Sequence, residues 1–142
     1  MDLISKEKRS RNMSAIKGVN TKPELLVRSY LRSNGVKYRC NVKSLPGSPD
    51  IAIKKYKLAL DVHGCFWHGH TNCKHFRLPK SNTLFWDEKI GKNISRDLRT
   101  KKQLEALGFQ YFVIWECEVK EIKMSKAKNF VKLYFMRRGI DQ

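Results

Sequence analysis

Alternation between apolar and polar positions predicts short β-strands in the first half of the chain. The segment VKYRCNV, residues 36–42, alternates strictly, which predicts a half-buried strand with Cys40 as a thiol in the core. The apolar runs IAI at 51–53 and LALDV at 58–62 are separated only by KKYK, which predicts a β-hairpin. The largely apolar run FQYFVIW at 109–115 predicts a further buried strand, and we assign two of its aromatic side chains to the core, Phe112 and Trp115.

The first helix of the main domain has a clear start and stop. Residues 21–24, TKPE, predict an N-terminus with Thr21 as the N-cap and Glu24, three residues later, as its capping-box partner. The helix would stop at the Asn-Gly pair 34–35, because this pair favours a turn.

Three more helices are predicted, and together with the strands they define the fold class. Residues 82–107 have apolar side chains at four-residue spacing, and Gly91 leaves open whether they form one helix or two. A last helix begins near Ser125, and a short basic helix is expected over residues 5–17. The order of helix, three strands, helix, strand and helix predicts an α/β fold with a mixed β-sheet flanked by helices. We expect one domain over all 142 residues, with residues 1–20 as an N-terminal arm.

Charge narrows the class of partner. The chain has 30 Lys and Arg against 13 Asp and Glu, a net charge of +17 and a pI of about 10. Such a field attracts polyanions, so nucleic acid is the expected partner. A membrane surface is disfavoured because the apolar residues do not form a long amphipathic basic helix.

No apolar run reaches the length of a signal peptide or a membrane span. We therefore expect a cytoplasmic protein, associated with the nucleoid in use. In that reducing compartment, cysteines are expected to be metal ligands, catalytic groups or buried thiols rather than disulfides.

The cysteines and histidines have metal-ligand spacing. Cys65, His70 and Cys73 follow the pattern C-x4-H-x2-C, and Cys117 comes 44 residues after Cys73, just beyond the predicted strand. A tight loop and one distant strand end suit tetrahedral Zn²⁺. The alternative is three buried thiols and a surface histidine, and His75 is a competing ligand.

An acidic pair forms the second chemical signal. The hairpin would place Asp50 beside Asp61, and paired carboxylates with a main-chain carbonyl suit Mg²⁺, which can promote hydrolysis of a phosphodiester. The spacing resembles the PD…(D/E)-x-K signature of restriction-type nucleases, with His63 in place of the lysine. Equally, Pro-Asp is a common turn dipeptide, and Asp61 could simply end a strand.

Histidine and aromatic side chains surround this acidic pair in the sequence. His63 and His68 could accept a proton from water near neutral pH, and Asp97 on the following helix could orient one of them. Three aromatic side chains beside lysines could stack on or wedge between DNA bases, although core packing explains each of them equally well: Phe66, Trp67 and Trp86.

Five segments, taken together, resemble the very short patch repair (Vsr) endonuclease family: NMSAIKGVNTKPE, LPGSPD, HGCFWHGHTNC, FWDEKIGKNISRD and VIWEC. The likeness covers residues 8–118. It implies a restriction-endonuclease-like core with a structural zinc knuckle. It also implies an enzyme that nicks duplex DNA on the 5′ side of the thymine in a T·G mismatch, which arises when 5-methylcytosine is deaminated.

The resemblance also implies roles for individual residues. Asp50 and the main-chain carbonyl of Val62 would hold Mg²⁺, and Glu24 would orient a water on the metal. His68, helped by His63, would act as the base, with Asp97 supporting a histidine. Zinc would be held by Cys65, His70, Cys73 and Cys117. DNA would be wedged from the major groove by Phe66, Trp67 and Trp86, and entered from the minor-groove side by Met13 and Ile16.

Two departures from the family pattern stand out. Some members have no acid at the position of Asp61; because Asp61 and His63 share one face of the predicted strand, we favour Asp61 as a second Mg²⁺ ligand. Gly69 stands where a histidine can occur.

Two other functions remain as alternatives: a Vsr-like restriction or homing endonuclease without mismatch specificity, and a non-catalytic zinc module that binds DNA. The expected partner is double-stranded DNA with a T·G mismatch, and mismatch-repair proteins are further candidate partners. The protein is expected to act as a monomer.

Overall fold

The computed structural model describes residues 21–141, and the side chains of residues 21–139. The helix expected over 5–17, and with it Met13 and Ile16, lies outside the described residues. Within the described part of the chain, none of the helices is both long and apolar enough to cross a membrane.

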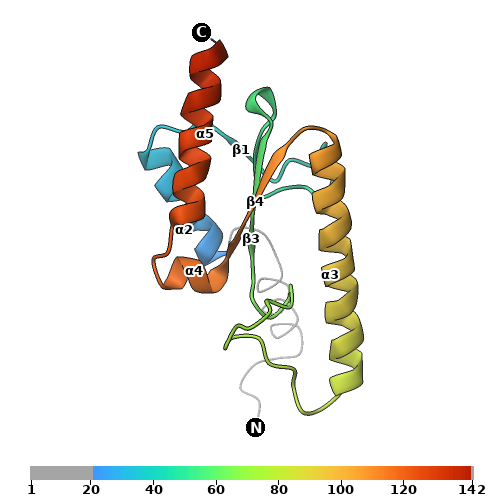
Figure 1. Ribbon diagram of the computed structural model, residues 1–142. Coiled ribbons are helices and arrows are strands. Elements are labelled where there is room, and N and C mark those ends of the chain that lie inside the picture. The colour runs from blue at the N-terminus through green and yellow to red at the C-terminus, as the bar shows by residue number, and fades with distance from the viewer. Residues whose placement is uncertain (1–20, 142) are drawn as a thin grey trace, which may run out of the picture.

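A four-stranded mixed sheet forms the centre of the fold (Figure 1). Its strands are β1 (Arg39–Cys40), β2 (Ile51–Ile53), β3 (Leu58–His63) and β4 (Gln110–Trp115), in the order β1-β2-β3-β4. The first three strands are antiparallel, and β4 pairs with β3 in parallel. The predicted hairpin and mixed sheet are therefore confirmed.

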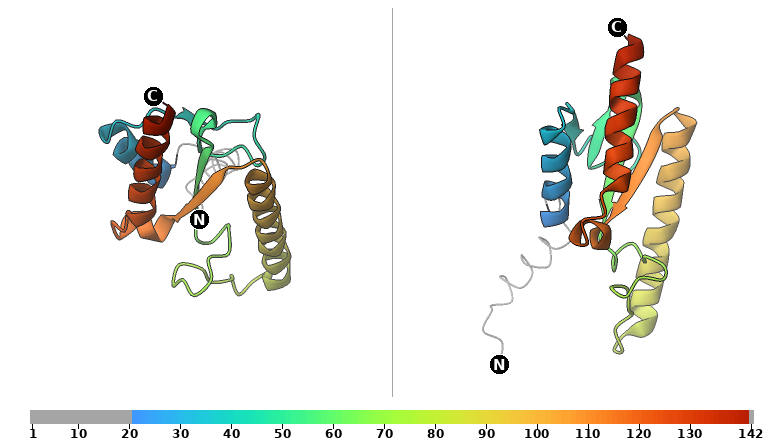
Figure 2. Two further views of the ribbon diagram at one scale, coloured as in Figure 1. Left: turned by 45° about the horizontal axis from the view of Figure 1, so that its top comes forward. Right: turned by 60° about the vertical axis from the view of Figure 1, so that its left-hand side comes forward.

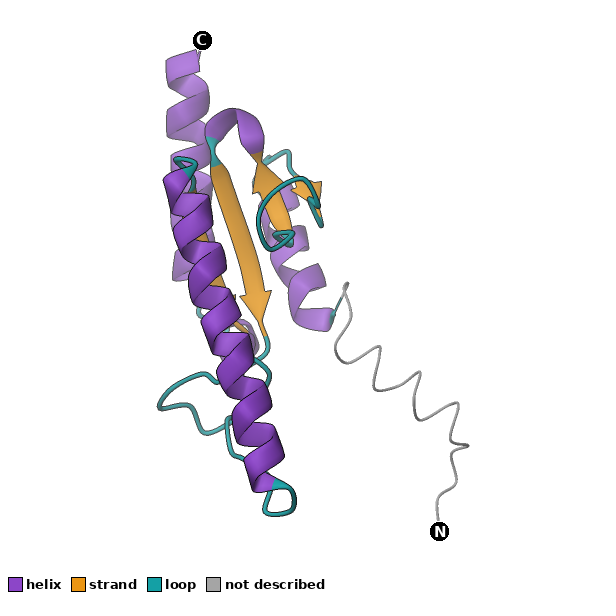
Figure 3. Ribbon diagram, turned by 90° about the vertical axis from the view of Figure 1, so that its right-hand side faces the viewer, coloured by secondary structure: helices purple, strands orange, loops and turns teal. Residues whose placement is uncertain are grey.

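Helices cover both faces of this sheet (Figure 2). α2 (Lys22–Ser33) and α5 (Ser125–Asp141) lie on one face, and α3 (Thr83–Ala106) runs along the other (Figure 3). A short helix that the sequence pattern did not predict, α4 (Glu116–Lys120), joins β4 to α5.

The larger part of the core lies between the sheet and the pair α2 and α5. Phe130 of α5 and Leu31 of α2 are fully buried there against β3 and β4. A smaller cluster on the opposite face packs Leu104 of α3 against Ala59 and Phe109. β3 is therefore buried on both faces, which explains why its sequence is almost continuously apolar.

The N-cap and the end of α2 lie where the sequence predicted them, and the capping-box role of Glu24 stays a prediction. Thr21 has extended backbone angles, and its Oγ1 accepts a hydrogen bond from the Glu24 N–H at 3.4 Å. The Glu24 carboxylate pairs with Arg28 at 3.4 Å. The helix ends at Ser33, and Gly35 follows with a φ of +81°.

One prediction about secondary structure was wrong, and one question that the sequence left open is answered. The strand expected over 36–42 is reduced to Arg39–Cys40 at the sheet edge, because only these two residues pair with β2 and Asn41 then has a φ of +50°. Cys40 is exposed and is not a core thiol. Gly91 does not divide the second helix, since α3 is continuous over 24 residues.

Replacing Gly91 by alanine is expected to stabilise the protein by about 0.5–1 kcal/mol, because glycine loses more backbone entropy in a helix interior. Gly91 is exposed, and a Cβ there would meet nothing within 4 Å. Urea unfolding measures the change.

Gly69→Ala is the matched control and should destabilise the fold. Gly69 has a φ of +58°, and its Cβ would lie 2.7 Å from Ile94 Cδ1. Equal stability of the two variants would contradict this account of both glycines.

Candidate active site and metal centre

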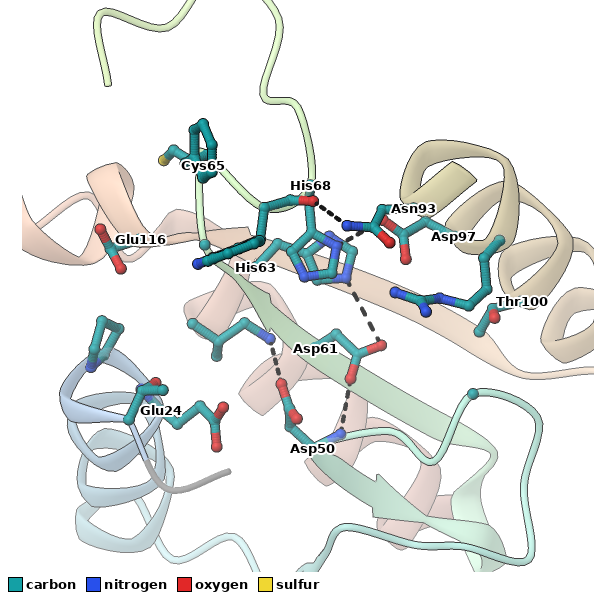
Figure 4. Close-up of a pocket in the computed structure, with 18 of the residues that line it drawn as sticks. Glu24, Asp50, Asp61, His63, Cys65, His68, Asn93, Asp97, Thr100 and Glu116 are labelled. Atoms are coloured by element: carbon teal, nitrogen blue, oxygen red, sulfur yellow. Dashed lines mark hydrogen bonds and ion pairs between the residues drawn. The ribbon is translucent and has the colours of Figure 1, made fainter. Parts of the chain in front are cut away.

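A cleft of about 880 Å³ opens where β3 ends, between α2, α3 and the loop 64–82 (Figure 4). Its walls carry acidic residues from four different elements, α2, β3, α3 and α4, and both histidines of the proposed site. Lys89, Asn93 and Arg96 of α3 also line it, and two of these bring positive charge.

The two aspartates of the hairpin lie side by side in this cleft, as the sequence predicted. The Asp50 N–H donates to Asp61 Oδ1 at 2.8 Å, and the Val62 N–H donates to Asp50 Oδ2 at 2.8 Å. Glu24 reaches the same cleft from α2 (Figure 4). The antiparallel pairing of β2 with β3 produces this arrangement, since it brings the start of one strand to the end of the other.

Burial of the two carboxyl groups makes their negative charge costly. Burial, and after it the neighbouring Asp61 carboxylate, raises the pKa of Asp50 to about 8. Burial likewise raises the pKa of Asp61, although hydrogen bonds from Tyr111 and from the Asp50 N–H act in the opposite direction. A divalent cation beside Asp50 would offset this cost, so the donor chemistry fits a hard metal ion.

The two histidines form a stacked pair above the aspartates. Their ring centroids are 3.8 Å apart and the rings are nearly parallel, at 4°. His68 Nδ1 lies 2.6 Å from Asp97 Oδ2, so the histidine that Asp97 contacts is His68. Burial, with His68 as a smaller contribution, lowers the pKa of His63 to about 3, which keeps this ring neutral.

The four expected zinc ligands converge at the base of the loop. The ligand atoms of Cys65, His70, Cys73 and Cys117 all lie within 4.8 Å of one another, and Cys117 Sγ is 3.6 Å from His70 Nδ1. Ligands of tetrahedral Zn²⁺ stand roughly 3.5–3.8 Å apart, so the donor set fits this metal. His75 is exposed and is not part of this cluster.

Trp115 connects this cluster to the histidine pair. Its ring stacks on His70 with centroids 4.0 Å apart, and its edge contacts His63 at 5.3 Å. Trp115 is half-buried beside the cleft, whereas the sequence assigned it to the core. Phe112 does pack against the core, next to Phe130.

The three candidate wedge residues gather into one cluster. Phe66, Trp67 and Trp86 have ring centroids 5.1 to 5.8 Å apart, and each is half-buried. The Asn93 amide donates to the Trp67 carbonyl at 2.9 Å and thereby ties the loop to α3.

Sequence reasoning missed Tyr111, which it counted only as part of an apolar strand. The Tyr111 hydroxyl donates to Asp61 Oδ2 at 2.5 Å. The signal was present in principle, because a hydroxyl in a buried strand needs a hydrogen-bond partner.

Buried acids, an imidazole paired with a carboxylate and a strongly basic chain define a hydrolytic site for a polyanionic substrate. The family model described as DNA mismatch endonuclease Vsr matches residues 1–75. The chain is 49% identical over 119 residues to the type II nicking enzyme V.NmeAIP of Neisseria meningitidis serogroup A, with 84% of each chain covered. It is 41% identical over 119 residues to the DNA mismatch endonuclease Vsr of Escherichia coli K12, covering 84% of this chain and 76% of that protein.

A further relative is the type II nicking enzyme V.XorIIP of Xanthomonas oryzae pv. oryzae. The two chains are 42% identical over 127 residues, which cover 89% of this chain and 93% of that enzyme. The chain therefore belongs to the Vsr family of DNA mismatch endonucleases. It is an endonuclease that nicks DNA, so the non-catalytic zinc module is excluded as an alternative.

The pKa shifts predict how stability without Mg²⁺ depends on pH. The folded protein keeps a proton on Asp50 up to about pH 8, whereas the unfolded chain releases it near pH 3.8, so stability falls as pH rises between these values. His63 has the opposite effect: stability falls as pH drops below 6.5. In that range the unfolded chain takes up a proton on His63, whereas the folded protein does not do so until about pH 3. Of these two effects, only that of Asp50 extends over pH 6.5 to 8.

We therefore expect stability in Mg²⁺-free buffer to decline from pH 6.5 to 8, and Asp50→Asn to flatten that decline. Urea unfolding at several pH values measures both slopes. An unchanged slope in the variant would show that Asp50 is not the group responsible.

Proposed function

We propose that this endonuclease nicks one strand of duplex DNA at a T·G mismatch left by deamination of 5-methylcytosine, and that it depends on Mg²⁺. One observation carries the proposal: the acidic pair, the His68–Asp97 pair and two members of the aromatic cluster, Phe66 and Trp67, line a single cleft. Chemistry and base recognition can therefore act on the same nucleotide.

Asp50 and the main-chain carbonyl of Val62 are the proposed holders of Mg²⁺. The Val62 N–H fixes one oxygen of Asp50, and the raised pKa of Asp50 marks an acidic group that a cation would stabilise in its charged form. When bound there, Mg²⁺ supplies positive charge to the phosphate as negative charge develops on its oxygens. Glu24 lines the α2 side of the cleft and is the proposed group that orients a water molecule.

His68 is the proposed general base. Its Nδ1 donates to Asp97, which leaves Nε2 as the proton acceptor toward the attacking water. His63 stacks on this ring and stays neutral, so a proton gained by His68 meets no second positive charge in the stack. Asp97 would stabilise the resulting imidazolium, as a paired carboxylate does in other general-base sites.

The aromatic cluster is the proposed recognition element. Aromatic side chains can wedge between base steps, and this is easiest where a mismatch weakens pairing. Phe66 and Trp67 come just before His68 in the chain and pack against Trp86 of α3, so a wedged base would lie near the catalytic histidine. Met13 and Ile16 remain the proposed contacts on the minor-groove side.

Zinc at Cys65, His70, Cys73 and Cys117 is proposed to serve the fold. Four protein ligands leave no open position for water, which is typical of a structural site. The loop 64–82 has no helix or strand of its own, so a metal at its base would hold His68, Phe66 and Trp67 in place.

Nicking at a fully paired recognition sequence is the competing function, because several relatives bear the name type II nicking enzyme. The two functions can be separated with a library of duplexes that carry a T·G mismatch in varied sequence contexts. Nicking of these duplexes in Mg²⁺ is compared with nicking of the same sequences fully paired. We expect nicking 5′ to the mismatched thymine. Equal nicking of paired duplexes would support the competing function.

Within this assay, Asp50→Ala is expected to abolish nicking while DNA binding survives, because it removes the Mg²⁺ anchor and little of the net charge of +17. Glu105→Ala, an exposed acid near the far end of α3, is the matched control and should behave as wild type. Near-wild-type nicking by Asp50→Ala would refute the metal assignment.

For zinc, we expect elemental analysis to find about one Zn²⁺ per chain. Cys117→Ser should lose the metal and unfold at a lower temperature, whereas Cys40→Ser, which changes an exposed cysteine outside the cluster, should keep both metal and stability. A zinc-free protein as stable as the native one would disprove a structural zinc.

A further inference from the structure

The two aspartates of the cleft differ in how their oxygens are used. Asp61 Oδ1 accepts the Asp50 N–H at 2.8 Å, and Asp61 Oδ2 accepts the Tyr111 hydroxyl at 2.5 Å. Asp50 uses only Oδ2, which accepts the Val62 N–H; among the described residues its Oδ1 accepts no hydrogen bond. Asp50 therefore has an oxygen available for a cation, and Asp61 has a donor at each oxygen.

These bonds tie three strands together at the end where the cleft opens. Tyr111 of β4 reaches Asp61 of β3, and Asp61 in turn holds the backbone of Asp50, one residue before β2. Asp61 is buried, and its side chain is only 12% exposed. The backbone of Asp50 is thus fixed from one side by Asp61, while Val62 fixes its carboxylate from the other.

We propose that Asp61 and Tyr111 form a latch that positions Asp50, and that Asp61 is a positioning residue rather than a Mg²⁺ ligand. The proposal rests on the proposed function, since it assigns the metal to Asp50. It replaces the expectation that Asp61 is the second ligand. A cation at either oxygen of Asp61 would have to share that oxygen with a donor hydrogen already directed at it, and positive charges on the two would repel.

Comparison of two substitutions at position 61 separates a latch from a ligand. In Asp61→Asn, the amide oxygen can still accept the Asp50 N–H, and the amide NH₂ can donate to the Tyr111 oxygen. In Asp61→Ala, both bonds are lost. A latch needs the hydrogen bonds and not the charge, whereas a Mg²⁺ ligand needs the charged carboxylate.

We expect Asp61→Ala to slow nicking by about 10–100-fold, the range typical when support of a metal ligand is lost. Asp61→Asn should rescue most of that rate and keep the Mg²⁺ concentration for half-maximal nicking near the wild-type value. Tyr111→Phe should slow nicking, and the Asp61→Ala/Tyr111→Phe double variant should be no slower than Asp61→Ala, because both changes break the same unit. Tyr56→Phe, at the far end of the hairpin, is the matched control and should behave as wild type.

Equal loss of activity in Asp61→Asn and Asp61→Ala, with a higher Mg²⁺ requirement in both, would overturn the proposal and make Asp61 a ligand. Wild-type nicking by Asp61→Ala would also overturn it. Thermal unfolding and zinc content of each variant report folding separately.

Binding of Mn²⁺, measured by electron paramagnetic resonance in the absence of DNA, tests the latch independently of nicking. A latch predicts that Asp61→Ala weakens Mn²⁺ binding and that Asp61→Asn restores it; a ligand predicts weak binding in both. If the wild-type protein nicks no T·G duplex, the proposed function fails, and the Mn²⁺ result still decides between latch and ligand.

Discussion

The pairing of β2 with β3 at the end that carries Asp50 and Asp61 is the constraint on which the site depends. It brings two acidic side chains together in a buried position, where their charges repel and each resists ionisation. Backbone N–H groups from Asp50 and Val62 compensate in part by donating to these carboxylates. The proposed Mg²⁺ would supply the positive charge that these backbone donors do not provide.

Beside this end of the sheet, the loop 64–82 is held by contacts rather than by secondary structure. His68 is anchored to Asp97 of α3, the Trp67 carbonyl is anchored to Asn93, and Gly69 sits against Ile90 and Ile94. There is no room for a side chain at Gly69. The absence of a Cβ at this position lets the loop backbone lie closer to α3 than it could with any other amino acid. Contacts with the long helix α3 thus fix the positions of His68 and Trp67.

Sequence patterns predicted the features that depend on local order and failed where distant neighbours decide. The hairpin and α2 follow from runs and caps within a few residues, so they were predictable. The length of the strand around Cys40 was overestimated. Alternation of apolar and polar residues cannot show that a strand lies at the edge of a sheet, where few residues pair with a neighbouring strand. Trp115 and Tyr111 lie in a strand that reads as apolar core, and only the parallel pairing of β4 with β3 places them beside His63 and Asp61.

The bond between Tyr111 and Asp61 also limits how this sequence can drift over evolutionary time. Removing the hydroxyl alone leaves a buried carboxylate oxygen without its donor, and removing the carboxylate alone leaves a buried phenol without its acceptor. Either single substitution therefore gives a less stable protein. Replacing both Tyr111 and Asp61 by apolar side chains removes the donor and the acceptor together, so the Tyr111–Asp61 pair leaves no unpaired polar atom. Substitutions at the two positions are therefore expected to occur together: homologues should carry both members of the pair or lack both, and a homologue that lacks the pair must position the aspartate equivalent to Asp50 by other means.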